Sequence, residues 1–147
     1  LVLGDGQRSF HWAVDLQVGS GASFVAVGDF NQDGFTDIAT ANYSANTASI
    51  LLGRGDGNFD PALTLPTGSA PYALTVGDFD GDGKPDLAVV NGGPATMTVF
   101  TNWSSGTFQR VFTCATGWLP FHVYSSDDPF TSSRVNAACT AGKVVFR

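Results

Sequence analysis

The sequence of 147 residues contains no glutamate, so all 13 of its acidic side chains are aspartates. Glutamate favours helices, whereas aspartate and the 18 glycines favour turns, so this composition argues against a helical protein. Only 14% of the residues are charged and 43% are hydrophobic, which argues against a disordered chain. We therefore expect a folded domain that is rich in turns.

The chain also lacks the features that mark several functional classes. No apolar run reaches the roughly 18 residues that a membrane span needs, and no basic stripe with interleaved aromatic residues indicates binding to nucleic acid. The sequence has no Cys-x-x-Cys pair, no Gly-x-Ser-x-Gly elbow and no His-Glu-x-x-His motif. We therefore expect no membrane span, no nucleic-acid partner and no thiolate zinc site, and the sequence gives no motif of a familiar hydrolase class.

An internal repeat of 49 residues organises the chain. Residues 25–42 align without a gap with residues 74–91, and the same offset carries residues 50–59 onto residues 99–108 and back onto residues 1–10. The total length is three times this period. A repeat of this length is typical of an array of similar supersecondary units.

Each repeat alternates short apolar runs with turn residues. In the first full copy the runs are residues 24–27, 37–41, 48–53 and 61–65, and clusters of Gly, Asn and Asp separate them. Four short strands per repeat predict a four-stranded antiparallel blade, and hence an all-β fold of the β-propeller class.

The strongest local motif is Asp-x-Asn/Asp-x-Asp-Gly-x-x-Asp, which occurs at residues 29–37 and again at residues 78–86. Oxygen-bearing side chains stand at positions 1, 3, 5 and 9, glycine stands at position 6, and position 7 offers a backbone carbonyl. This spacing is typical of a calcium loop, although no helices flank it and no glutamate occupies position 12, so it is not an EF-hand. The alternative is a metal-free turn rich in Asp and Gly.

The motif predicts two calcium ions per chain. The expected ligands are Asp29, Asn31, Asp33, the Phe35 carbonyl and Asp37 in one loop, and Asp78, Asp80, Asp82, the Lys84 carbonyl and Asp86 in the other.

These motifs, together with the Leu-Leu-Gly-x-Gly-Asp-Gly-x-Phe run at residues 51–59, resemble the FG-GAP/VCBS repeat family, the blades of integrin-α-like β-propellers. The resemblance covers residues 1–121. It implies a calcium-stabilised propeller that is typically extracellular, and it assigns the same loop residues as metal ligands. Related repeats occur in adhesion proteins, lectins and accessory domains of secreted enzymes.

We expect one propeller-type domain over residues 1–147. Residues 1–23 form the end of a blade and a connector, residues 24–72 and 73–121 form two blades that carry the calcium loops, and residues 122–147 are irregular. The third copy lacks the motif, so this last segment is either a degenerate blade or an unrelated tail.

Three blade lengths are too few to close a ring. We expect a homodimer that completes six blades, because two or three blades alone would leave apolar faces and sheet edges exposed. The alternative is a fragment of a longer propeller. The chain begins at Leu1 without a leader, which we interpret as a mature form or a fragment of a secreted protein.

The primary functional prediction is a calcium-stabilised module for extracellular adhesion or recognition of a protein or glycan, with a binding rather than a catalytic role. A lectin-like module is one alternative, because Trp12, Trp103 and Trp118 depart from the repeat template and exposed aromatic rings stack on sugars. Gap filling between blades is the other explanation for these three residues.

A small metal-dependent phosphoester or ester hydrolase is the second alternative. His11 and His122 also depart from the template, and either could hold a second cation with Asp127 or Asp128. The more ordinary interpretation is that both histidines are structural. Whether Cys114 and Cys139 form a disulfide or remain thiols is left open by the sequence.

Overall fold

The computed structural model of the chain describes residues 2–4, 10–13, 15–93, 95–115, 138–140 and 143–145. These residues form twelve β-strands: β1 (Val2–Gly4), β2 (Phe10–Ala13), β3 (Ala22–Gly28), β4 (Asp37–Asn42), β5 (Thr47–Leu51), β6 (Leu63–Pro66), β7 (Pro71–Gly77), β8 (Asp86–Asn91), β9 (Thr96–Ser104), β10 (Thr107–Ala115), β11 (Ala138–Thr140) and β12 (Lys143–Val145). Among the described residues we find no helix with the length and apolar character that a membrane crossing requires.

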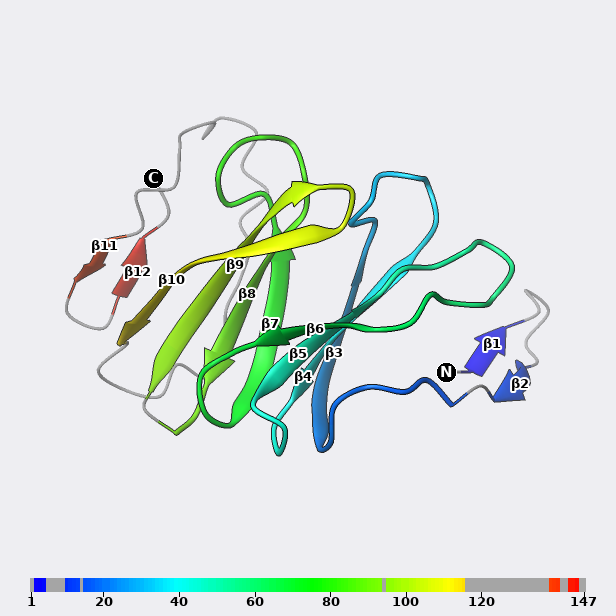
Figure 1. Ribbon diagram of the computed structural model, residues 1–147, viewed down its shortest axis with the longest axis horizontal. Coiled ribbons are helices and arrows are strands. Elements are labelled where there is room, and N and C mark those ends of the chain that lie inside the picture. The colour runs from blue at the N-terminus through cyan, green and yellow to red at the C-terminus, as the bar shows by residue number, and fades with distance from the viewer. Residues whose placement is uncertain are drawn as a thin grey trace.

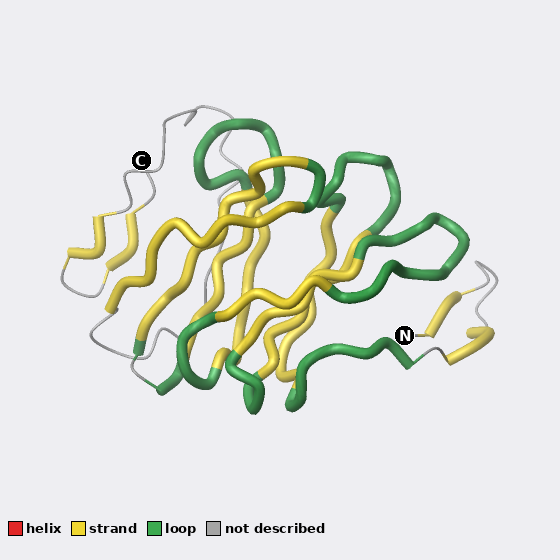
Figure 2. The backbone as a smooth tube through the Cα atoms, viewed as in Figure 1, coloured by secondary structure: helices red, strands yellow, loops and turns green. Residues whose placement is uncertain are grey.

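Eight of these strands make two antiparallel four-stranded sheets, with the orders β3-β4-β5-β6 and β7-β8-β9-β10 (Figure 1). The remaining strands make two short hairpins, β1-β2 and β11-β12. Turns and loops join consecutive strands throughout the two large sheets (Figure 2). The prediction of an all-β chain built from four-stranded antiparallel units is confirmed. The sheets begin at Ala22 and Pro71, two residues before the expected blade starts.

The pairing of the strands repeats with the period of the sequence. The pairs that correspond across the three copies are Gly4 with Phe10, Gly53 with Phe59, and Asn102 with Phe108. The first and second strands of each sheet also share a register irregularity, between Ala22 and Phe24 in one sheet and between Pro71 and Ala73 in the other. The two sheets are therefore structural copies of one unit.

The hydrophobic core lies between the two sheets, and small residues on one sheet meet large residues on the other. The first sheet contributes mainly alanines from β4 and β5, whereas the second contributes Leu74, Leu87, Val89 and Phe100. The small side chains let the sheets approach closely, as dense packing requires. At one end of this core, the ring of Phe30 meets the ring of Phe108 edge to face, with a centroid distance of 5.5 Å.

Equivalent positions on β3 and β7 differ strongly in burial. Leu74 on β7 is 4% exposed because its face of the second sheet packs against the first sheet. The corresponding residue on β3 is Val25, which is 60% exposed, and Val27 beside it is 62% exposed. An open hollow lined by Ala22, Ser23, Phe24, Val25 and Thr40 lies along this strand. The face of β3 that carries these valines is therefore an apolar surface that the described part of the chain leaves open.

Candidate metal centre

Two acidic loops lie at the same end of the molecule. Loop 1 (residues 29–37) joins β3 to β4, and loop 2 (residues 78–86) joins β7 to β8 (Figure 1). The loops touch, since the side-chain amide of Gln32 donates a hydrogen bond of 3.0 Å to the carbonyl of Gly83. The repeat therefore brings both candidate metal loops together.

Each loop is folded by hydrogen bonds from its own backbone to its aspartates. The first aspartate accepts from the N–H of the glycine at position 6, at 2.9 Å in both loops: Gly34 donates to Asp29 and Gly83 donates to Asp78. These glycines have φ values of 87° and 83°, a left-handed conformation that favours glycine. The expected sharp turn at position 6 is therefore present in both copies, and it aims the carboxylates into the loop.

The last aspartate of each loop is fully buried and holds two backbone amides. In loop 2, Asp86 accepts from the N–H of Phe79 at 2.7 Å and from the N–H of Asn102 at 2.8 Å. In loop 1, Asp37 accepts from the N–H groups of Phe30 and Gly53, both at 2.7 Å. Position 9 therefore ties its loop to the C-terminal end of the third strand in loop 2 and to a residue just after that strand in loop 1, a role that the ligand pattern did not predict.

Three carboxylates converge in loop 2. Ligand oxygens of Asp78, Asp80 and Asp86 all lie within 4.8 Å of one another. The pKa of Asp86 is raised to about 6 by burial and then by the charges of Asp80 and Asp78, against the opposing effect of its two amide bonds. Burial, followed by the charge of Asp82, also raises the pKa of Asp80. This donor set fits a calcium ion, because a hard cation binds oxygen ligands and would offset the charge that burial and repulsion disfavour.

The aspartate at position 5 has a side-chain partner within its own loop. In loop 2, the ammonium of Lys84 forms an ion pair with Asp82. Burial acts to raise the pKa of Asp82, but the hydrogen bonds and charge of Lys84 hold it below its usual value. In loop 1, Asp33 instead accepts a hydrogen bond of 2.7 Å from the side-chain amide of Asn31. Of the expected side-chain ligands in loop 2, the structure thus groups three and places Asp82 against Lys84.

The position-7 residues also differ between the loops. The Phe35 ring lies against Gly55 in the turn between β5 and β6, where a Cβ on that glycine would come within 2.3 Å of the ring. Lys84, the equivalent residue in loop 2, forms an ion pair with Asp82. The two loops therefore share one backbone framework and the same formal charge, but they differ in where the charges lie, with Asn31 and Phe35 in loop 1 replacing Asp80 and Lys84.

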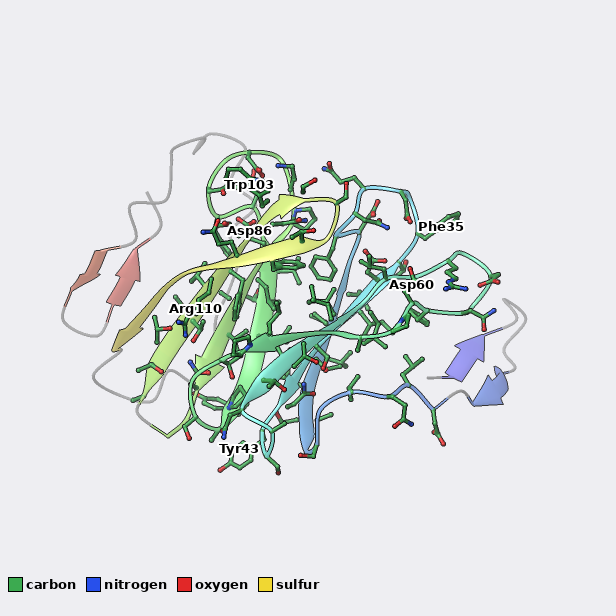
Figure 3. The ribbon with its side chains drawn as sticks, in the orientation of Figure 1. Phe35, Tyr43, Asp60, Asp86, Trp103 and Arg110 are labelled. Atoms are coloured by element: carbon green, nitrogen blue, oxygen red, sulfur yellow. The ribbon has the colours of Figure 1, made fainter. Side chains whose placement is uncertain are left out.

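Of the other candidate residues, Trp103 is the one whose side chain the structure describes. The described side chains do not include those of His11, His122, Asp127, Asp128, Trp12, Trp118, Cys114 and Cys139. Trp103 is described, lies near the end of β9 and is 74% exposed (Figure 3). This exposure shows that Trp103 does not fill a gap between the two sheets.

Sequence reasoning missed Asn102, which is buried and touches both halves of the molecule. Its N–H donates to Asp86, and its side-chain amide donates to the carbonyl of Phe30 in loop 1. The signal was present in the repeat, because Asn102 stands where the preceding copy has Gly53.

The comparison with solved structures gives a limited likeness. A chain from the crystal structure of BBS1N in complex with ARL6DN, soaked with lead, has a TM-score of 0.46 and 15% sequence identity. The match covers 77% of the present chain and 30% of that chain. The comparison with curated proteins found no match.

The comparison with family models gives a match over the centre of the chain, at residues 29–89. This stretch runs from loop 1, through β4, β5 and β6 of the first sheet and β7 of the second, into β8. The matching model describes an FG-GAP-like repeat, so the resemblance noted in the sequence is confirmed over residues 29–89, which lie within the all-β part of the chain that the structure describes.

Proposed function

We propose that this chain is a calcium-stabilised β-propeller-type interaction module that acts in adhesion or ligand recognition outside the cell. The convergence of Asp78, Asp80 and Asp86 within 4.8 Å carries this proposal. Burial, followed by the repulsion of neighbouring carboxylates, raises the pKa values of Asp80 and Asp86, and a cation would offset both effects. The role of calcium is to stabilise the fold and fix the loops rather than to catalyse a reaction.

The direct test is a calorimetric titration of calcium into protein that has been stripped with EDTA. We expect two ions per chain, one for each loop. Asp78→Ala should reduce the stoichiometry to one ion, whereas Asp56→Ala, which changes an aspartate in a turn outside both loops, should leave two. Absence of calcium binding by the unmodified chain would overturn the proposal.

We also propose that a second copy of the chain covers the open face of β3. The repeat supports this proposal, because Leu74 at the position equivalent to Val25 packs against the sheet that precedes it. Two chains of three blade lengths would complete a six-bladed ring. Burying the two valines would contribute to assembly roughly in proportion to the apolar area removed from water.

Light scattering after size exclusion tests this assembly. We expect a mass of about 31 kDa in calcium, twice the 15.3 kDa of one chain. Val27→Asp should give a folded monomer, because a charge on this face cannot be buried at the interface without a large cost. Tyr43→Asp, at an exposed aromatic residue in the turn after β4, should remain dimeric. A monomeric unmodified protein would contradict the proposal.

A lectin-like function is the second candidate, and the exposure of Trp103 favours it. The ring follows Asn102, whose N–H donates to Asp86, so it stands beside the end of loop 2 (Figure 3). We expect binding on a glycan array that Trp103→Ala abolishes and Tyr43→Ala preserves. An array without hits in the presence of calcium would remove this candidate.

A further inference from the structure

Asn102 is a buried residue that joins the two acidic loops. Its N–H donates to Asp86 of loop 2 at 2.8 Å, and its side-chain amide donates to the Phe30 carbonyl of loop 1 at 2.5 Å. Its side-chain oxygen accepts from the N–H of Gly106 at 3.2 Å. The side chain is fully buried, so these bonds form away from water. A buried polar group that is hydrogen-bonded through both its donor and its acceptor atoms holds its neighbours in fixed positions.

The connection continues into loop 1. Phe30 is the second residue of that loop, and its N–H donates to Asp37 at 2.7 Å. A continuous path therefore runs from Asp37 through Phe30 and Asn102 to Asp86, which joins the buried carboxylates at position 9 of both loops. The Phe30 ring packs on Phe108, the strand partner of Asn102, and this packing closes the path from solvent.

This link is not a property of the repeat itself. The equivalent of Asn102 in the first sheet is Gly53, which makes the same backbone bond to Asp37 but has no side chain. A Cβ on Gly53 would lie 2.3 Å from the carbonyl oxygen of Thr36, so the first sheet has no room for an asparagine there. At this position the second sheet thus carries a side chain that the first sheet lacks, and that side chain reaches loop 1.

We propose that Asn102 couples the two loops, so that calcium bound in one loop raises the affinity of the other; this inference rests on the calcium binding proposed above. An ion in loop 1 fixes the Phe30 peptide, which orients the Asn102 side chain and hence the amide that holds Asp86. The second ion then binds a loop that is already ordered and loses less conformational entropy. By thermodynamic linkage the effect is reciprocal.

A second, weaker route exists on the surface. Gln32 of loop 1 donates to the Gly83 carbonyl of loop 2 at 3.0 Å, but this bond is exposed. Water competes for both of its partners, so we assign the coupling to the buried path through Asn102. Gln32 also has a positive φ of 59°, where the second loop has Gly81, so Gln32→Gly removes the contact without straining the backbone.

The experiment measures the calcium affinity of each loop separately by following the amide resonances of Gly34 and Gly83 during titration. Disabling loop 1 with Asp33→Ala should weaken binding at loop 2 by about fivefold, the lower end of typical couplings between sites. Disabling loop 2 with Asp78→Ala should weaken loop 1 by the same factor. If the intact loop of each variant binds calcium with unchanged affinity, the coupling is overturned, and this test needs no substitution at Asn102.

Substitution at Asn102 then tests the assignment. Asn102→Gly installs the residue that the first repeat carries and keeps the backbone N–H for Asp86. In this background the fivefold effect should vanish. Ser23→Ala is the matched control, since it removes a different bond between the sheets, from the Ser23 hydroxyl to the Pro71 carbonyl at 3.0 Å, and should leave the coupling intact.

The outcomes separate the inference from the function on which it rests. Failure of the unmodified chain to bind calcium would overturn the proposed function itself. Two ions bound with independent affinities would overturn the coupling alone. Coupling that survives Asn102→Gly but disappears in Gln32→Gly would overturn the assignment to Asn102 and place it on the surface contact.

Discussion

Replacing Asp37 with alanine is expected to lower the free energy of unfolding by about 4 kcal/mol in EDTA, and by more in calcium, where the variant also loses a proposed ligand of loop 1. Asp37 is fully buried and accepts the N–H groups of Phe30 and Gly53. Its removal leaves two buried donors without a partner, and each such donor costs about 1–3 kcal/mol. The effect does not require the metal, because the lost bonds belong to the fold. Urea denaturation followed by circular dichroism measures it.

Two comparisons sharpen this prediction. Asp33→Ala, in the same loop but exposed, should change stability in EDTA by less than about 1 kcal/mol, as is usual for surface substitutions. Asp86→Ala should cost less in EDTA than Asp37→Ala, because the charges of Asp80 and Asp78 help to raise the pKa of Asp86 and its removal relieves that repulsion. Equal, small losses for Asp37→Ala and Asp33→Ala would show that the buried amide bonds contribute little.

The sequence predicted those features that depend on local spacing. The offset of 49 residues predicted equivalent copies, and the pairs Gly53 with Phe59 and Asn102 with Phe108 are equivalent in the structure, because register follows from the repeated turns and apolar runs. The glycines at position 6 adopt the conformation that the turn requires. The register of neighbouring strands and the conformation of these glycines depend on residues close in the sequence, so a single sequence is enough to predict them.

Features that depend on contacts across the chain were not predicted. The ligand pattern treated Asp82 as equivalent to Asp80, yet Asp82 forms an ion pair with Lys84, two residues away. It predicted Asp37 and Asp86 as ligands, but it did not predict that each also accepts an amide from a residue 16 positions away. Such bonds arise only when the third strand of each sheet is in place, so spacing within the loop cannot reveal them.

Calcium is expected to stabilise the chain by about 5 kcal/mol when its free concentration is about a hundredfold above the dissociation constant. One site that binds only the folded state contributes about 2.7 kcal/mol under that condition, and the chain is proposed to have two. At roughly 2–4 °C per kcal/mol for a domain of this size, the melting temperature should rise by roughly 10–20 °C over its value in EDTA. Differential scanning calorimetry measures both curves.

Asp80→Ala should reverse its effect on stability between these two conditions. In calcium it removes a ligand from loop 2, so the variant should lose about half of the gain that calcium gives the unmodified chain. In EDTA it should be as stable as the unmodified chain or more so, because it relieves the crowding among three carboxylates that lie within 4.8 Å of one another. Asp56→Ala is the control: Asp56 accepts the N–H of Asn58 at 2.9 Å in a turn outside both loops, so its loss should be the same in both conditions. A uniform loss in Asp80→Ala, with and without calcium, would mean that loop 2 is a turn held by its own hydrogen bonds and that its carboxylates do not serve a cation.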